Sequence, residues 1–347
     1  MSHLQLEALL ARHRAFWTMG EVDEPLETIG QYHPLAARAP YPFADGTLAQ
    51  EGSRFAAELV DPVRHVGTGE GFDSPMGWPF LRGRGGGDLC WTEAVAGCPV
   101  RWRSGHVWAD AFLDAEAAGT WQQRAADSPW LARLLDIARL LGTQADGRYP
   151  VVTPLLRGPI DIAAAAVGDE DLCVLLVDDP EACRHLVQQS TEVFVTVATA
   201  WRDATPAFAG GSVLYGIWAP GTTVRTQCDN AALLSPAVYD DLLVPQDEEI
   251  CRHFDYPLIH THSCFIRMAA EPLLRVAGLA GIQVSLDYPG RPSVSELLPT
   301  LQRLNAAKPL ILTGPVTAAE LEMLRAGLSP RGLSLQVDLL PPGQGRD

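Results

Sequence analysis

YPLIHTHS, residues 256–263, is a short apolar run that ends in two histidines. An apolar run of this length is typical of a buried strand. His260 and His262 lie two positions apart, so the alternation of side chains along a strand sends both imidazoles to the same face. Two imidazoles on one face can hold a metal ion through their neutral nitrogens. The alternative is structural, with one histidine capping the strand and the other packed in the core.

Short apolar runs of the same kind alternate with longer helical stretches along much of the chain. The expected strands lie near 26–32 and at 149–156, 212–218, 223–227, 258–262, 282–286, 310–313 and 333–337. The expected helices lie at 3–17, 170–205, 235–254, 266–278, 293–306 and 317–327. This alternation predicts an α/β fold with a mostly parallel sheet, and the number of strands fits a (β/α)8 TIM barrel. No GxGxxG or GxxxxGK(S/T) motif follows a strand, so the usual marker of nucleotide-binding sheets is missing.

The segment 40–125 differs from the rest because it is rich in Gly, Pro and Trp. It includes the glycine-rich run RGRGGG at 82–87. We expect this segment to form an extension of loops and short elements that lies like a lid over the carboxyl-terminal face of the barrel. With residues 342–347 as a flexible tail, the sequence predicts a single barrel domain over 1–347.

Charge and cysteine content restrict the partners and the compartment. The 26 basic and 42 acidic residues give a net charge of −16, which argues against nucleic acid or an anionic membrane as a partner. A small-molecule substrate fits this balance, including an anion in a locally basic pocket. The seven cysteines show no CxxC spacing, and neither a signal peptide nor an apolar run of about 18 residues is present. We therefore expect a cytoplasmic protein.

Polar residues recur where the expected strands end, which is where a TIM barrel places its catalytic groups. Any one of them alone reads as an ordinary cap, but their recurrence at strand after strand points to a site. The residues are Gln31, His33, Arg157, Trp218, Gln227, Asp229, His260, His262, Asp287, Thr313 and Asp338.

Four segments carry a family resemblance. In chain order they are RGPIDIAA at 157–164, DDPE at 178–181, QCDNAALLSP at 227–236 and IHTHS at 259–263. Together they resemble the uroporphyrinogen decarboxylase superfamily, which includes the corrinoid-dependent zinc methyltransferases. The resemblance covers roughly residues 128–338. It implies a TIM barrel, in agreement with the strand–helix pattern, and a homodimer.

The porphyrinogen branch of this superfamily carries an amino-terminal Arg-Gln-Ala-Gly-Arg segment that grips substrate carboxylates. Here the corresponding residues 27–33 are ETIGQYH, and the next arginine is Arg38. The late Gly-His-Gly segment of that branch is also missing. A substrate with eight carboxylates needs clustered cations in its pocket, so uroporphyrinogen itself is not the expected substrate.

The methyltransferase branch uses a His-x-Cys pair at a strand end, in some members an acidic ligand at the next strand end, and a late Cys. The resemblance places His260 and His262 at the His-x-Cys position, with His in place of Cys. It places Asp287 at the acidic ligand and Asp338, or Gln336 in another register, at the late Cys. Imidazoles and carboxylates are harder ligands than thiolates. They suit Zn²⁺ with an open position, but also Fe²⁺ or Mn²⁺.

Two cysteines near these positions offer softer donors. Cys228 lies between two polar strand-end residues, and Cys264 follows His262 by two positions. Cytosolic cysteines are more often inert core residues than ligands, so both rank below the histidines and carboxylates as metal ligands.

The resemblance favours a metal-dependent, methyltransferase-like enzyme that acts on a small molecule or on a methyl group bound to a corrinoid. The corrinoid would be carried by a partner protein. In this hypothesis Asp287 is a metal ligand or a base, with Arg157 and Asp229 as further catalytic groups. The residues expected to bind substrate are Gln31, His33, Trp218, Gln227 and Thr313.

Three alternatives remain at this point. The first is a metal-independent decarboxylase of a small carboxylate, in which Arg157 holds the carboxylate and an aspartate stabilises developing positive charge. The second is metal-assisted hydrolysis, although the HxH motif of amidohydrolases normally follows the first strand rather than a late one. The third is a barrel that binds a ligand without catalysis.

Overall fold

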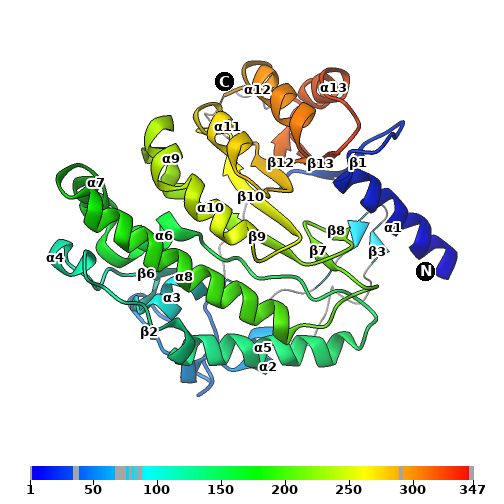
Figure 1. Cartoon of the computed structure of the whole chain (residues 1–347). Helices are drawn as coiled ribbons and strands as arrows, with labels where there is room; N and C mark the ends of the chain where they lie inside the picture. The colour runs from blue at the N-terminus through cyan, green and yellow to red at the C-terminus, as the bar shows by residue number, and fades with distance from the viewer. Residues whose placement is uncertain are drawn as a thin grey trace.

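The computed structural model describes residues 2–33, 39–66, 76–77, 80–81, 83, 88–288 and 292–343, and Figure 1 shows their arrangement. Arg38, residues 82 and 84–87 of the glycine-rich run and residues 344–347 of the expected tail lie outside the described residues. Among the described helices, none is long and apolar enough to cross a membrane.

A six-stranded sheet forms the centre of the molecule. In spatial order its strands are β1 Leu26–Gln31, β13 Leu333–Leu339, β12 Leu310–Val316, β11 Gly281–Ser285, β10 Tyr256–His262 and β9 Thr223–Gln227. All neighbouring strands are parallel, so their carboxyl ends meet at one edge. The predicted α/β class with a mostly parallel sheet is confirmed. The YPLIHTHS strand, β10, lies inside the sheet between β9 and β11.

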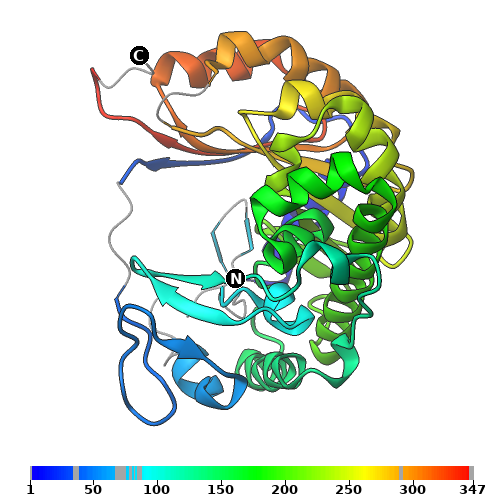
Figure 2. The same ribbon diagram turned by 90° about the vertical axis from the view of Figure 1, so that its left-hand side faces the viewer.

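Helices cover the outer face of this sheet, because parallel strands need crossover connections. The crossovers from β10 to β13 contain α11 Ile266–Arg275, α12 Val294–Ala307 and α13 Ala318–Gly327, which lie along this face (Figures 1 and 2). Both α12 and α13 begin with a capping box, in which Ser293 and Thr317 exchange hydrogen bonds with a glutamate three residues later. Each box satisfies two helix-terminal N–H groups and fixes where its helix starts.

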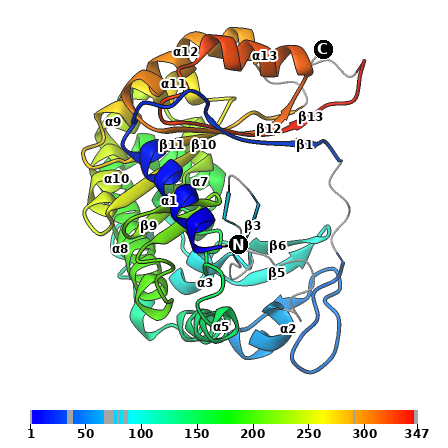
Figure 3. The same ribbon diagram turned by 90° about the vertical axis from the view of Figure 1, so that its right-hand side faces the viewer.

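The inner face of the sheet changes from apolar to polar along the strands. At their amino-terminal ends, Leu258 and Ile311 pack against the tryptophan that ends α1 His3–Trp17 (Figure 3). Two positions farther along the same strands lie His260 and Thr313, which share this face because side chains alternate along a strand. The polar residues of the inner face are therefore gathered toward the carboxyl-terminal edge.

Two expected strands are absent from the parallel sheet. Residues 149–156 are extended but form no strand of the described sheets, since Pro150 and Pro154 have no N–H to donate. Residues 212–218 form most of a hairpin, with β7 Ser212–Leu214 and β8 Ile217–Ala219. Both residues of its turn, Tyr215 and Gly216, have positive φ angles (50° and 71°), as tight hairpin turns require. The sequence thus predicted eight strands for the parallel sheet, two more than the six that it contains.

Several helices differ from expectation. Two were not expected, α5 Pro129–Ala145 and α6 Pro159–Val167. The helices expected at 170–205 and 235–254 are each divided in two. They are α7 Asp169–Asp178 with α8 Pro180–Ala204, and α9 Pro236–Leu242 with α10 Val244–Cys251. The first division follows from the Asp179 N-cap and the proline after it, because that pair starts a new helix.

Residues 40–125 are more regular than the expected loops. They contain an antiparallel sheet of β2 Arg54–Phe55, β5 Val100–Arg103 and β6 His106–Ala109, and the hairpin β3 Met76–Gly77 with β4 Phe80–Leu81. Their helical elements are η1 Ala57–Leu59, α2 Pro62–Val66, α3 Trp91–Ala96, α4 Ala115–Ala118 and η2 Ala125–Asp127. Aromatic and aliphatic side chains of this segment form a second core with α5 and α8. Two tryptophans of this segment, Trp91 and Trp102, are buried in that core, whereas Trp108 is exposed.

Candidate functional site

Polar side chains from three neighbouring strands meet at the carboxyl-terminal edge of the sheet. The strand register sets Gln227 of β9 and Gln283 of β11 on either side of His260 of β10. His262 lies two positions farther along β10. Asp229 follows β9 in the short helix η3 Asp229–Leu233, and Asp287 follows β11. The parallel register thus brings together residues that are up to 60 positions apart in the chain (Gln227 to Asp287).

The two imidazoles face each other through the same ring atom. The Nε2 atoms of His260 and His262 are 3.1 Å apart, and the ring planes are nearly perpendicular, at 87°. The Oδ1 atom of Asp229 lies 3.3 Å from Nε2 of His262. One carboxylate oxygen and two imidazole nitrogens therefore converge on a common point.

Acceptors on the far side of each ring fix its orientation. Nδ1 of His262 lies 2.7 Å from Oδ1 of Asp287, and the other oxygen of Asp287 accepts the Ser263 hydroxyl at 2.9 Å. Nδ1 of His260 faces Oε1 of Gln283. Both partners are acceptors, so each Nδ1 carries the ring proton and each Nε2 presents a lone pair. Two lone pairs at this separation would repel each other, and either a proton on one Nε2 atom or a metal ion between them removes the repulsion.

Two of the three ligand-atom separations match those of a tetrahedral zinc site, and all three atoms lie within 4.8 Å of one another. Ligands 2.0–2.1 Å from a tetrahedral ion are about 3.3 Å apart, close to the 3.1 Å and 3.3 Å separations found here. In addition, Oδ1 of Asp229 is buried and forms no hydrogen bond of good geometry within the described part of the chain; its polar neighbour is Nε2 of His262, at an ion-pair distance of 3.3 Å. Such orphaned oxygens are uncommon in folded proteins, and a metal ion would satisfy this one. Among the described residues, Asp229, His260 and His262 form a group that can hold a metal.

The electrostatics also favour a positive charge at this point. Contacts with Asp229 and Asp287 raise the pKa of His262 to about 9. Burial, aided by the nearby Arg225 guanidinium, lowers the pKa of His260 to about 4. Near neutral pH the two histidines therefore share at most one proton at their facing Nε2 atoms. This proton lies beside the carboxylate of Asp229. A metal cation at the same point gains the same stabilisation.

Asp161 in α6 positions Asp229. It is almost fully buried, and its two carboxylate oxygens accept the backbone N–H groups of Asp229 and Asn230 at 3.0 Å and 2.8 Å. Burial and the charge of Asp229 raise the pKa of Asp161 to about 8. Asp161 belongs to the RGPIDIAA segment, which supported the family resemblance but gave no sign of this role.

Replacing Asp161 by Ala is expected to destabilise the protein and to weaken metal binding. Two buried N–H groups would lose their acceptor, at about 1–3 kcal/mol each, and η3 would no longer hold Asp229 in place. Urea unfolding and a metal-binding titration would measure both effects. Asp169→Ala is the matched control, because within the described residues Asp169 accepts from the side chain of Asn230 and from no backbone N–H of η3. Equal behaviour of the two variants would contradict the positioning role.

Two of the expected substrate-binding residues join this network. Nε2 of Gln227 donates to Asp229 at 2.6 Å, and Nε2 of Gln283 donates to the Thr313 hydroxyl at 2.7 Å. Arg157, expected among the catalytic groups, does not join it. Its guanidinium donates to the buried Glu93 at 2.6 Å, so its charge is compensated within the second core.

The other expected substrate-binding residues lie elsewhere. Trp218 is buried, and its indole N–H donates to the carbonyl of Phe208, because the hairpin turns it toward α1. Gln31 is exposed on β1. Its neighbour Gly30 lines a cavity on the inner face, so strand alternation points the Gln31 side chain to the opposite face. His33 is exposed beyond the end of β1.

The remaining expected metal ligands lie outside the group of three. Asp287 orients His262 through Nδ1 and does not face the converging Nε2 atoms. Asp338 lines the inner-face cavity. Cys228 is buried in the apolar core that contains side chains of α11 and α12, with its sulfur against Gly158. Cys264 is exposed in the turn after β10. The sequence analysis also placed both cysteines below the histidines and carboxylates as candidate metal ligands.

Several site residues were missed by the sequence analysis. Tyr215, at the tip of the β7–β8 hairpin, donates its hydroxyl to Oε1 of Gln283 at 2.8 Å and lies 3.3 Å from Nδ1 of His260. Arg225 of β9 donates to the Tyr215 hydroxyl at 3.1 Å. Gln283 and Arg225 had one available signal, a polar residue inside an otherwise apolar or β-branched strand.

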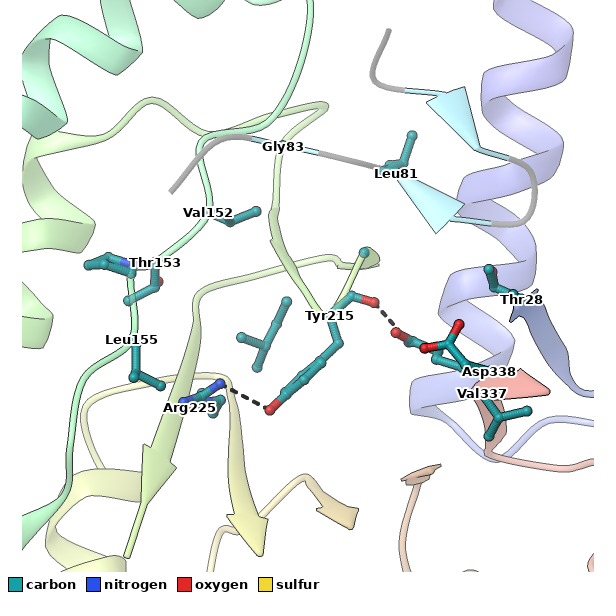
Figure 4. A pocket seen from close by; sticks show the side chains of 15 residues that line it. Thr28, Leu81, Gly83, Val152, Thr153, Leu155, Tyr215, Arg225, Val337 and Asp338 are labelled. Atoms are coloured by element: carbon teal, nitrogen blue, oxygen red, sulfur yellow. Dashed lines mark hydrogen bonds between the residues drawn. The ribbon is translucent and has the colours of Figure 1, made fainter. Parts of the chain in front are cut away.

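A cavity of about 520 Å³ adjoins this network on the inner face of the sheet. Figure 4 shows Tyr215 in the cavity wall, with Arg225 on one side of it and Asp338 on the other. Its volume is that of a small-molecule site.

Comparison with known proteins gives structural similarity only. No protein-family model matches the chain, and no curated protein matches its sequence. Among solved structures, the chain is similar to a methyltransferase from Methanosarcina mazei, with a TM-score of 0.61 and 13% sequence identity. The similarity covers 96% of this chain and 94% of that one. It therefore extends over the whole fold, and at this identity it concerns the fold alone.

Proposed function

We propose that the protein is a metal-dependent, methyltransferase-like enzyme of the uroporphyrinogen decarboxylase superfamily. The observation that carries the proposal is the convergence of two imidazole Nε2 atoms and a buried carboxylate oxygen, all within 4.8 Å of one another. The four family-like segments and the structural similarity to a methyltransferase support it. We further propose that residues 1–347 form one domain and that the six parallel strands belong to a TIM barrel, with the site at its carboxyl-terminal face.

In this proposal His260, His262 and Asp229 hold Zn²⁺. This ligand set replaces the one expected from sequence, in which Asp287 and Asp338 were ligands. A zinc ion with three protein ligands keeps an open position, where it can bind and activate a thiol or polarise an oxygen.

The protein's own groups prepare this position. Asp287 and Gln283 hold the ring protons of the two histidines and so keep both Nε2 lone pairs on the site. Burial raises the pKa of Tyr215, so its hydroxyl stays protonated beside His260. A corrinoid on a partner protein is the proposed carrier of the methyl group.

The expected result is about one zinc ion per chain in purified protein, measured by elemental analysis. Zinc-loaded protein should accelerate methyl transfer from methylcobalamin, a free corrinoid, to a thiol such as 2-mercaptoethanol. Dialysis against a chelator should abolish this rate and zinc should restore it. Metal-free protein that transfers methyl groups at the full rate would contradict the proposal.

The alternatives are less well supported. Decarboxylation without a metal relied on Arg157 as the carboxylate-binding group, and this guanidinium is paired with Glu93. Hydrolysis could use the same metal ligands. The methylcobalamin assay separates these reactions, because only a methyltransferase consumes the corrinoid-bound methyl group.

A further inference from the structure

The cavity beside the metal ligands contains two oppositely charged groups. Arg225 of β9 and Asp338 of β13 both line it, and the aromatic ring of Tyr215 stands between them (Figure 4). Much of the remaining wall is apolar, from residues such as Leu155 and Leu214. The cavity thus resembles small-molecule sites, in which an apolar wall carries a few polar groups that fix orientation.

Arg225 carries a positive charge that no carboxylate offsets in the described part of the chain. One Nη atom donates to the Tyr215 hydroxyl at 3.1 Å and the other to Oε1 of Gln227. Both acceptors are neutral. The guanidinium also lies 5.7 Å from the centre of the Tyr215 ring, a cation–π contact that stabilises the charge in part but supplies no counter-ion. An anionic ligand group would supply the missing partner, and a guanidinium can hold a carboxylate through two hydrogen bonds.

Asp338 lies at the other charged position, where it is exposed to solvent. No ion pair or hydrogen bond to its carboxylate is found among the described residues. Its Oδ1 atom lies over Gly30 on the neighbouring strand, in the space that a side-chain Cβ at that position would fill. The missing side chain at Gly30 therefore leaves room for the carboxylate in the cavity wall.

We propose that this cavity binds a zwitterionic small molecule, with its anionic group on Arg225 and its cationic group on Asp338. A simple anion would gain the contact with Arg225 but would be repelled by Asp338, and a simple cation would meet the reverse. Only a molecule with both charges satisfies both groups. The inference rests on the proposed function in one respect, that the bound zwitterion is the substrate of the metal site.

Tyr215 links this cavity to the metal ligands. Its ring forms part of the cavity wall, while its hydroxyl contacts Nδ1 of His260 and accepts from Arg225. A ligand on Arg225 is thus separated from a metal-bound imidazole by one side chain. The cavity thus approaches His260 from its Nδ1 side, opposite the Nε2 atom that would hold the metal.

The test measures binding of α,ω-amino acids, from glycine to 6-aminohexanoate, to the zinc-treated full-length protein by isothermal titration calorimetry. The series varies the spacing between the two charges. The carboxylate and the alkylammonium of matching chain length are the single-charge controls. One zwitterion is expected to bind at least about tenfold more tightly than either of its controls, since it gains both ion pairs. Equal binding of the carboxylate control, or no binding of any zwitterion, would overturn the inference.

Two variants assign the charges. Arg225→Gln and Asp338→Asn should each weaken binding of the best zwitterion by about tenfold or more. Asp338→Asn should also bind the carboxylate control at least as well as the unmodified protein does, because the repulsion is removed. Asp241→Asn is the matched control, since it makes the same charge change at an exposed residue paired with Arg184. Unchanged zwitterion binding by Asp338→Asn, which alters no described contact, would also overturn the inference.

Zinc content measured on the same samples separates this inference from the proposed function. Zwitterion binding by protein that takes up no zinc would leave the cavity assignment standing and contradict the metal site. Stoichiometric zinc without zwitterion binding would contradict only the cavity assignment.

Discussion

Replacing His260, His262 or Asp229 by Ala is expected to remove most of the bound zinc and the methyl-transfer rate. Each substitution deletes one of three converging ligand atoms, and a catalytic zinc site needs three protein ligands. The fold should persist, because the apolar residues of β10 are unchanged. Zinc affinity measured by competition with a chromophoric chelator, together with circular dichroism, would test both statements.

Two further aspartates make this experiment sharper. Asp287→Asn should lower zinc affinity by about 10–100-fold, the usual effect of losing a group that orients a ligating histidine. Asp338→Asn should leave zinc affinity unchanged, because Asp338 lies in the cavity wall outside the ligand group. The sequence-based ligand set predicts large losses for both. A loss for Asp338→Asn as great as for Asp229→Ala would refute the ligand assignment made from the structure.

Replacing Asp247 by Asn is expected to stabilise the protein near neutral pH. Asp247 in α10 is buried and accepts the hydroxyl of Tyr239 at 3.1 Å. Burial raises its pKa from 3.8 to about 7. As the pH rises between these values, the unfolded chain releases a proton that the folded protein retains. The contribution of Asp247 to the free energy of unfolding therefore falls through this window, by about 4 kcal/mol, and is constant above it.

The asparagine side chain keeps an acceptor for Tyr239 and does not titrate, so the variant lacks this loss. The measurement is the difference in free energy of unfolding between variant and unmodified protein, from urea titrations at several pH values from about 4 to 8. The difference should grow in favour of Asp247→Asn as the pH rises. Asp241→Asn, at an exposed residue, should show no such trend. A difference that stays constant across this range would show that Asp247 titrates normally in the folded protein.

Local sequence determined much of the sheet and its helices. The apolar run before His260 predicted β10, and the same reasoning located β1, β9, β11, β12 and β13. It could do so because β10 and β12 are largely apolar or β-branched over their own length, while β1, β9, β11 and β13 combine apolar or β-branched residues with polar ones. The pairing of His260 and His262 on one face also followed from sequence alone, since strand alternation is a local property.

The sequence predicted two strands that are absent from the parallel sheet. In both segments the backbone, rather than the hydropathy of the side chains, decides the structure. Residues 149–156 are apolar enough for a strand, but their two prolines remove ladder donors. Residues 212–218 are apolar as well, and the positive φ angles of Tyr215 and Gly216 fold them into a hairpin. That turn carries Tyr215 to the metal ligands, a contact that hydropathy does not encode.

The tertiary structure alone decided which carboxylate faces the histidines. In the sequence Asp229 and Asp287 are equivalent, because each follows a strand beside β10. Asp161 holds the backbone of η3 so that Asp229 points toward Nε2 of His262, whereas Ser263 holds Asp287 against Nδ1. Likewise, the sequence analysis expected Arg157 in the site, but this residue meets a buried glutamate, whereas Arg225, which it missed, lines the cavity. The types of ligand are therefore written in the sequence, while their direction and charge balance depend on partners that only folding brings within hydrogen-bond distance.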